Sequence, residues 1–281
     1  MTQPHFVLRR TAALGDVVLA TPVLRRLRQE NPLAKITVQT AYPDVFANNP
    51  ACDVLLSPGA PVHPAATLID LDMAYERLPR MHIVDAYLTH VFGDCMQPPP
   101  PEMFVLRKMP RAPKLIAVHA TNAGWRNRTL PREVWRDVVL ALQADGYSVV
   151  LVGTERDRLD GVDCSTFYLP HLQAQAALIA SCALFVGSDS GLLHVAGAVG
   201  TPVVGVFTCA APEYRMPRNG LPGAAVWPTL DCVGCLHDRL PPVTTEFCAR
   251  GDNACVRAVT AHGIVDAVRS VLTQLARKEP V

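Results

Sequence analysis

Residues 184–207, which read LFVGSDSGLLHVAGAVGTPVVGVF, decide the fold class of this chain. Leu184–Gly187 and Pro202–Phe207 are short apolar runs of the kind that buried strands show. Gly191–Val199 between them has the length and composition of a helix. A strand, a helix and a second strand in this order are typical of a parallel sheet. The sequence therefore predicts an α/β fold with an open parallel sheet.

The same region is the most apolar part of the chain, so a membrane span has to be considered. Asp189, His194 and Pro202 interrupt the apolar run Ala183–Phe207, which favours buried strands and a helix over a span. The segment Met1–Arg10 lacks the long apolar stretch and the small-residue cleavage site of an export signal. We therefore expect a cytoplasmic protein with no membrane span.

Length and charge narrow the classes of function. The chain has 281 residues, which is enough for two domains of ordinary size. Because 49% of its residues are hydrophobic, a sizeable core can form. The formal net charge of +1 gives no case for bulk electrostatic binding to nucleic acid or to an anionic membrane. An anionic substrate must therefore be held by local groups.

Two alternating series of strands and helices follow each other along the chain. In the first, a strand at Phe6–Arg9 and a turn at Thr11–Asp16 lead into a helix at Val17–Asn31, which carries Pro22 in its first turns. The other predicted elements are strands at 35–40, 54–57, 67–70, 115–119 and 148–152 and helices at 85–92, 131–144, 171–181 and 263–278. This order predicts two open α/β units in one chain.

A run of four prolines separates the two series. Gln97–Glu102 cannot continue a helix or a central strand and favours a stiff, extended linker, although a proline-rich surface loop is the alternative. We place an N-terminal domain at 1–100, a second domain at 101–262 and a closing amphipathic helix at 263–281. A ligand would lie in the cleft between the carboxyl ends of the two sheets.

Two turns at expected strand ends carry candidate site residues. In Leu14-Gly15-Asp16 the glycine permits a tight turn, and Asp16 would be either a helix cap or a general base that faces the cleft. In Ser188–His194, residues Ser190 and Gly191 open a helix whose free backbone N–H groups can bind an anion. A capped helix with a core histidine is the alternative for this second turn.

A third segment, His119–Pro131, connects a strand to a helix. It carries Arg126 and Arg128 just before the proline that starts the helix. Two arginines beside a helix N-terminus would clamp a diphosphate, or they would belong to an ordinary solvated basic loop.

Together these three segments resemble glycosyltransferase family 9, whose members transfer heptose from ADP-heptose and adopt the GT-B fold of two Rossmann-type domains facing each other across a cleft. The family pattern of small residues, Gly-Asp-Val, a helix and Pro appears here at Thr11–Pro22. The Asp-Ser/Thr-Gly-x-x-His signature appears at Asp189–His194, and the loop with a basic residue three before proline appears at His119–Pro131. The match spans nearly the whole chain in the correct order.

The resemblance implies a role for each matching residue. Asp16 would be the catalytic base that deprotonates the acceptor hydroxyl, and Arg128 stands where the family usually has lysine. The first turn of the helix would bind the diphosphate through backbone N–H groups, and Glu155 would bind the nucleotide ribose. The full implied donor-binding set is Thr121, Asn122, Arg128, Glu155, Asp189, Ser190, Gly191, Leu192 and His194.

The implied reaction is an inverting sugar transfer by single displacement, with no catalytic metal. The first domain is short for the family, so the acceptor site is expected to be reduced or unusual. A lipopolysaccharide core, a protein hydroxyl and a small natural product all stay open as acceptors, and so does an oligomer. The main alternative is a non-catalytic GT-B-like module that docks a partner, and a GT-B epimerase is a third class.

Four cysteines in one irregular stretch, 228–255, predict a structural metal site. They are Cys232, Cys235, Cys248 and Cys255, in the pattern C-x2-C-x12-C-x6-C. A CxxC turn directs two thiolates at one ion and two further cysteines complete a tetrahedral zinc or iron site. Autotransporter heptosyltransferases, in the same family, carry a four-cysteine iron site. Cys209 is a spare ligand nearby, and His237 is a competing one.

Overall fold

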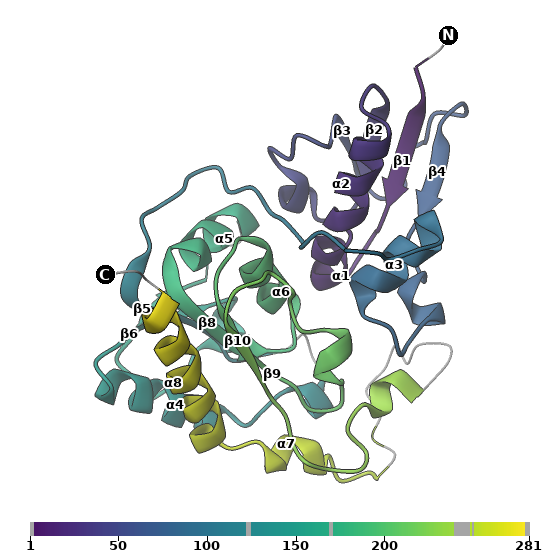
Figure 1. The fold of residues 1–281 in the computed structure, drawn as a ribbon. Coiled ribbons are helices and arrows are strands. Elements are labelled where there is room, and N and C mark those ends of the chain that lie inside the picture. The colour runs from purple at the N-terminus through teal and green to yellow at the C-terminus, as the bar shows by residue number, and fades with distance from the viewer. Residues whose placement is uncertain (1–2, 122–124, 169–170, 239–247, 249, 279–281) are drawn as a thin grey trace.

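The structure is a computed structural model that describes residues 3–121, 125–168, 171–238, 248 and 250–278. Within these residues, two separate sheets form the framework (Figure 1). The first has the strand order β3-β2-β1-β4 and the second has the order β10-β9-β8-β5-β6-β7. Every neighbouring pair is parallel, which confirms the predicted α/β class.

The first sheet is built from residues 5–70 and is covered by three helices. Its strands are β1 (His5–Arg9), β2 (Lys35–Gln39), β3 (Val54–Leu56) and β4 (Thr67–Asp70). The helices are α1 (Leu14–Leu19), α2 (Thr21–Glu30) and α3 (Ile83–Phe92). This half of the chain lies at the upper right of Figure 1.

The expectation of one helix over Val17–Asn31 is wrong, because the structure has two helices that meet at Ala20. Pro22 has no N–H to donate to the carbonyl of Val18, and its ring crowds that carbonyl. The hydroxyl of Thr21 donates to the Val18 oxygen instead, at 2.8 Å. The first helix also starts earlier than expected, so Asp16 lies in a helical first turn and not in the preceding loop.

The second sheet is built from residues 112–226. Its strands are β5 (Ala112–His119), β6 (Ser148–Val152), β7 (Ser165–Phe167), β8 (Cys182–Ser188), β9 (Val203–Val206) and β10 (Gly223–Val226). Its helices are α4 (Arg132–Ala144), α5 (Leu172–Ser181), α6 (Gly191–Ala198), α7 (Ala254–Ala258) and α8 (Ala261–Lys278). The two edge strands, β7 and β10, were not expected from the sequence.

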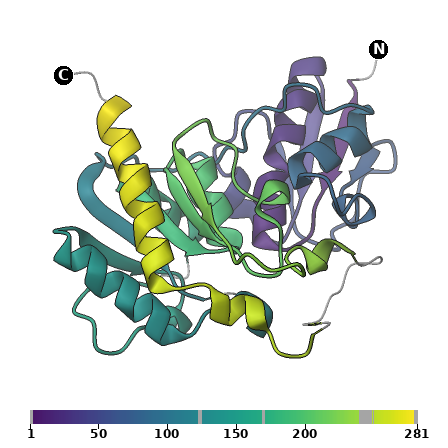
Figure 2. The same ribbon diagram turned by 60° about the horizontal axis from the view of Figure 1, so that its bottom comes forward.

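Alternating side chains of the second sheet pack into two different cores. Ala117 and Phe185 face the core that includes α5 and α6, while Ile116 and Leu184 face the core that includes α4 and α8. Successive residues of a strand point to opposite faces, so these near-continuous apolar strands are buried on both sides. Figure 2 shows α8 lying beside α4 across this part of the molecule.

The chain between the two sheets is fastened to both halves. After the four prolines, the N–H of Glu102 donates to the Thr21 hydroxyl at 3.0 Å, and the N–H of Met103 donates to the Ala198 carbonyl at 3.1 Å. One hydrophobic core also runs through both halves, since it includes α1 and α2 of the first and α5 and α6 of the second.

Candidate functional site

The candidate site lies where the strand order of each sheet reverses direction. In the second sheet the chain moves outward from β5 through β6 to β7 and then returns to β8 on the other side of β5. Open α/β sheets bind ligands at this position, outside the carboxyl ends of the strands. His119–Pro131 follows β5, and the Asp189-Ser190-Gly191 turn follows β8. Two of the three predicted segments therefore meet here.

The helices α1 and α6 bring the third segment to the same place. A β-carbon on Gly15 would lie 2.6 Å from Cδ2 of His194, and one on Gly191 would lie 2.9 Å from Cδ2 of Leu14. These distances leave no room for any side chain, so both glycines are needed for the close approach. Asp16, the residue after Gly15, therefore lies beside the start of α6.

Asp16 is held by a buried arginine. Its Oδ2 accepts a hydrogen bond from Nη2 of Arg10 at 2.7 Å and a longer one from the backbone N–H of Ala13 at 3.4 Å. The Asp16 side chain is 15% exposed and that of Arg10 is 6% exposed. The bond to Ala13 shows that the helix-cap and the cleft interpretations of Asp16 are not exclusive.

Arg128 is bonded to the Asp-Ser-Gly turn. Its Nη2 donates to the carbonyl and to Oδ2 of Asp189, both at 2.7 Å. Burial opposes the charge of Asp189, but Arg128 and Arg215 hold the pKa of this carboxyl below its ordinary value. The structure therefore joins the loop after β5 to the loop after β8, and no described residue bonds Nη1 of Arg128.

Arg215 adds a second positive charge between the two halves. It follows the 3-10 helix Pro212–Tyr214, and its guanidinium carbon lies 5.7 Å from the centre of the Tyr75 ring in the first half. Burial disfavours its charge, but Tyr75, Asp189 and Asp16 raise the pKa of Arg215. A cation thus stands near both candidate carboxylates.

Ser190 precedes α6 but does not cap it with its side chain. Its hydroxyl is 3.0 Å from Nδ1 of His119, and Nε2 of His119 is 3.3 Å from Oδ1 of Asp157. The N–H groups of the first turn of α6, at Gly191 and Leu192, are therefore not used by a side-chain cap. A helix start of this kind attracts an anion.

Thr121 is engaged within the protein. Its N–H and its hydroxyl both donate to Oδ1 of Asp157, at 2.8 and 2.7 Å, so neither donor is directed at a ligand. Glu155 is exposed in the 3-10 helix Glu155–Asp157 beyond β6. Asn122 lies outside the described residues.

Two histidines at the site are buried in neutral form. Burial lowers the pKa of His194 to about 4, against the smaller opposing effect of Asp189, whose Oδ1 lies 3.9 Å from Nε2. Burial also lowers the pKa of His119, with Asp157 acting in the opposite direction. His194 packs against Gly15, so the core-histidine interpretation and the site interpretation describe the same side chain.

Sequence reasoning missed Arg10, Glu76, Asp157 and Arg215. Arg10 and Asp16 are close in sequence, but the other contacts join residues far apart, such as Arg10 with Glu76 and Thr121 with Asp157. Of these four residues, Arg10 could have been found from the sequence, because it directly follows the first predicted strand, where the loop that would face a ligand begins.

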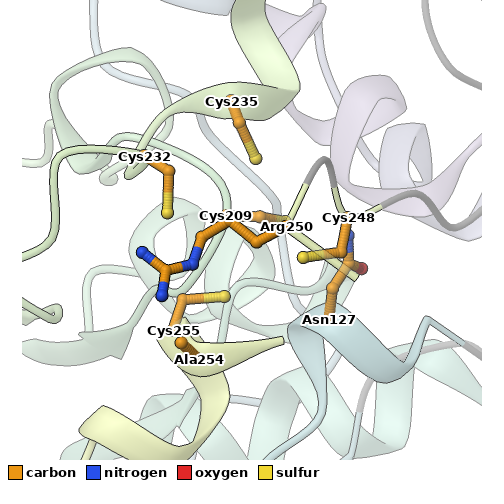
Figure 3. Close-up of a pocket in the computed structure, with 8 residues that line it drawn as sticks. All are labelled: Asn127, Cys209, Cys232, Cys235, Cys248, Arg250, Ala254 and Cys255. Carbon is orange, nitrogen blue, oxygen red and sulfur yellow. The ribbon is translucent and has the colours of Figure 1, made fainter. Parts of the chain in front are cut away.

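The four predicted metal ligands line one pocket (Figure 3). Cys232 and Cys235 approach it from one side, and Cys248 and Cys255 from the other. Cys209, Asn127, Arg250 and Ala254 complete the lining. Among the described residues, however, no three side chains of His, Cys, Asp or Glu are grouped closely enough to hold a metal ion.

The pocket places thiols in unequal surroundings. Backbone N–H groups of Asn253 and Arg250 outweigh the effect of burial and lower the pKa of Cys248. Burial and the neighbouring thiols, Cys235 first among them, raise the pKa of Cys255 to about 11. His237 is not one of the residues that line this pocket, and its Nε2 accepts from the N–H of Ala211 at 3.1 Å.

Among the described residues, no helix is both long and apolar enough to cross a membrane.

Solved structures of low sequence identity share this fold. The iron-containing dodecameric glycosyltransferase TibC from enterotoxigenic E. coli superposes with a TM-score of 0.80 at 15% identity, over 97% of this chain and 77% of that one. A family 9 glycosyl transferase from Veillonella parvula gives 0.73 at 16% identity, over 96% and 97%. The E. coli ADP-heptose lipopolysaccharide heptosyltransferase II gives 0.68 at 15% identity, over 98% and 100%.

Curated relatives match over a shorter region. Lipopolysaccharide heptosyltransferase 2 of Escherichia coli K12 is 31% identical over 102 residues, which are 32% of this chain and 29% of the relative. Lipooligosaccharide heptosyltransferase 2 of Haemophilus influenzae is 31% identical over 92 residues, 28% of this chain and 26% of the relative. The chain thus spans less than a third of these curated relatives in sequence.

The family model described as glycosyltransferase family 9 (heptosyltransferase) matches residues 102–237. This region holds the loop after β5 and the Asp-Ser-Gly turn, two of the three segments that predicted the resemblance. Residues 102–237 of this chain are a glycosyltransferase family 9 domain.

Proposed function

We propose that the chain is an inverting glycosyltransferase that moves heptose from ADP-heptose to a hydroxyl acceptor. The observation that supports the proposal is the close contact of Gly15 in α1 with the start of α6. It brings the next residue, Asp16, near a helix start that no side chain caps, where a diphosphate would bind. A base and a diphosphate site at one position are the two requirements of a single displacement. The structure of TibC in complex with ADP-D-beta-D-heptose, similar in fold, supports the choice of donor.

Each group has a defined part in the proposed reaction. The acceptor oxygen attacks the anomeric carbon and loses its proton to Asp16, while the bond from that carbon to the β-phosphate oxygen breaks. ADP leaves with the electron pair of that bond. The N-terminus of α6 and Nη1 of Arg128, which no described residue bonds, would stabilise the growing negative charge of ADP. The step would then need no catalytic metal.

The test is release of ADP from ADP-heptose by the purified chain. Asp16→Asn should lower turnover by at least ~100-fold, the scale of losing a general base, and leave ADP affinity nearly unchanged. Asp70→Asn, which removes a half-exposed carboxylate paired with Arg9, is the matched control and should keep turnover. Near-normal turnover of Asp16→Asn would exclude Asp16 as the base.

The same assay separates the alternatives. A chain that binds ADP but releases no nucleoside diphosphate from ADP-, UDP-, GDP- or dTDP-sugars with any acceptor would be the non-catalytic module. The acceptor, a cytoplasmic location and an oligomeric state stay predictions. Because TibC, which shares the fold, is dodecameric, size-exclusion chromatography of this chain is the test of the oligomer.

We further propose that Cys232, Cys235, Cys248 and Cys255 hold one structural iron or zinc ion. Four thiols around one pocket are a donor set that suits either metal, and the iron-containing TibC shares the fold. Binding of the ion would contribute local folding free energy to 228–255. Cys235→Ser should release the metal, whereas Cys164→Ser, outside the pocket, should not. Protein purified without chelator that contains neither iron nor zinc would contradict the site.

A further inference from the structure

We propose that Arg10 is the positioning residue that fixes the orientation and the charge of Asp16. The inference rests on the proposed function, because it concerns the group that would take the acceptor proton. It assigns a role to a buried arginine that neither the motifs nor the family match singles out.

Arg10 is placed by the first sheet and not by Asp16. It directly follows β1, and its backbone N–H donates to the carbonyl of Gln39 in β2 at 3.2 Å. Its Nη1 donates to the carbonyl of Leu71, just after β4, at 3.0 Å. The backbone of Arg10 is thus fixed by β2 and its guanidinium by the residue after β4, and only 5% of Arg10 is exposed.

A second carboxylate shares the positive charge. Nη2 of Arg10 donates to Oδ2 of Asp16 at 2.7 Å and to Oε1 of Glu76 at 3.1 Å. Glu76 is itself buried, at 8% exposure. The Arg10 guanidinium carbon lies 5.3 Å and 5.8 Å from the ring centres of Tyr75 and Tyr87, whose faces favour a cation.

This arrangement leaves one oxygen of Asp16 available. Oδ2 is bound by Arg10 and Ala13, while no described residue bonds Oδ1. Oδ2 already accepts two hydrogen bonds, so Arg10 would favour Oδ1 as the atom that receives the proton. The positive charge of Arg10 lies between the like charges of Asp16 and Glu76 and bonds both carboxylates.

Other charged and titratable groups face Asp16 from both halves. From the first half these are Glu76, Tyr75 and Tyr87, with Asp72 4.0 Å from Nη1 of Arg10. From the second half they are His194 and Arg215. Among the residues that the structure describes, Arg10 is the only cation hydrogen bonded to the Asp16 carboxylate, so its removal should dominate the change.

The decisive measurement is a carboxyl ¹³C NMR titration, with the Asp16 signal assigned by its loss in Asp16→Asn. In Arg10→Gln the Asp16 titration midpoint should rise by about one pH unit or more, the usual effect of losing an opposite charge within 4–6 Å. In Glu76→Gln the midpoint should move in the opposite direction, since a like charge is removed and Arg10 is left to Asp16 alone. Arg10→Lys keeps the charge and should stay close to the wild type.

Arg9→Gln is the matched control, because Arg9 is the preceding arginine and bonds Asp70 and Gln39 instead. Its Asp16 midpoint should not move. Unchanged midpoints in both Arg10→Gln and Glu76→Gln would overturn the proposal. If Arg10→Gln does not fold, Arg10→Lys decides it through kcat. An ammonium keeps the charge but not the planar geometry that bonds Leu71, Asp16 and Glu76, so kcat for ADP release should fall at an unchanged Asp16 midpoint. A purely structural arginine predicts wild-type kcat in folded Arg10→Lys.

Turnover gives a second readout that keeps this proposal separate from the proposed function. In Arg10→Gln the acidic limb of the pH profile of kcat for ADP release should move upward, while KM for ADP-heptose should not change, because the donor is held by the other half. A wild-type chain without ADP release would reject the proposed function, and the NMR midpoints would still test Arg10. Loss of turnover in Asp16→Asn with a wild-type pH profile in Arg10→Gln would reject Arg10 alone.

Discussion

Arg128 is the residue at which the structure changes the interpretation of the donor loop most. The sequence suggested a free cation that clamps a diphosphate, whereas the structure shows Nη2 committed to Asp189. The Arg128 side chain is only 16% exposed, and it also lies 5.4 Å from the Trp125 ring centre. A ligand would therefore meet an arginine that is already oriented.

We predict that Arg128→Ala weakens ADP binding by about 1.5–3 kcal/mol, the value of a hydrogen bond to a charged group. The loss has two parts, because the cation disappears and Asp189 stays near the diphosphate with less compensation. Isothermal titration calorimetry with ADP measures it. Arg136→Ala, which removes an exposed arginine on α4, is the control and should bind ADP normally. Equal affinities in the two variants would show that the loop is aligned wrongly.

Buried histidines predict how stability depends on pH. Burial lowers the pKa of both His82 and His194 from 6.5 to about 4. Between these values the unfolded chain binds protons that the folded protein does not, so the free energy of unfolding rises with pH. Acidification from pH 6.5 to pH 4 should thus cost about 1.4 kcal/mol per pH unit for each histidine.

Urea unfolding at several pH values tests this prediction. His194→Gln should reduce the slope of the free energy of unfolding against pH by one histidine's share. His262→Gln is the control, because the His262 side chain is 83% exposed and should not change the slope. An unchanged slope in His194→Gln would contradict the burial argument.

At the scale of elements, the contact between α1 and α6 decides whether a site exists at all. Gly15 of α1 contacts α6, and Gly191 of α6 contacts α1. The two helices pack on different sheets. The sequence predicted Gly15 in a turn, where its conformational freedom mattered, and Gly191 at the start of a helix. In the structure both lie inside helices, and what matters is the lack of a side chain.

Gly15→Ala should therefore destabilise the protein although alanine favours helices. Its β-carbon would lie 2.6 Å from Cδ2 of His194, a buried ring, and such overpacking typically costs about 1–3 kcal/mol. Gly263→Ala in α8 is the matched control, since its β-carbon would lie 3.5 Å from Oγ1 of Thr260, and alanine should stabilise it by about 0.5–1 kcal/mol. Urea unfolding of the two variants should give changes of opposite sign.

At the scale of the whole molecule, the two halves share a core and several polar contacts. His82 of the first half is 3.1 Å from the Met216 carbonyl, and Arg218 of the second donates to Asp85 at 2.8 Å. The main hydrophobic core includes side chains of both sheets. The halves should therefore unfold together despite their separate sheets.

Tryptophan fluorescence can test this, because Trp125, Trp135 and Trp227 all lie after the proline linker. Their signal reports the second half only, whereas far-UV circular dichroism reports both. We predict one urea midpoint by the two probes, as cooperative unfolding requires. A circular-dichroism transition that begins before the fluorescence transition would show that the first half unfolds alone.

The sequence by itself predicted what depends on neighbours along the chain. The apolar runs and the helix between them predicted the parallel α/β class, since strand and helix periods are local properties. The position of the Asp-Ser-Gly turn directly after one of these runs also predicted that it lies at the end of a strand, which is β8. The family motifs likewise depend on short spacings, and the match over 102–237 confirmed the family. Two local features were still missed. The break that Pro22 causes between α1 and α2 was not predicted, and the edge strands β7 and β10 have too few residues to show a strand period.

Tertiary structure alone decided which distant groups touch. Arg10 meets Glu76 because β4 pairs with β1, and Gly15 meets His194 because two helices from different sheets pack against each other. The order of strands in a sheet and the packing of helices from different halves are not encoded in the spacing of neighbouring residues. Neither contact could therefore be inferred from the sequence. The chemistry that we propose for Asp16 depends on both contacts. The sequence therefore named the candidate base, and the fold determined what holds it and what it faces.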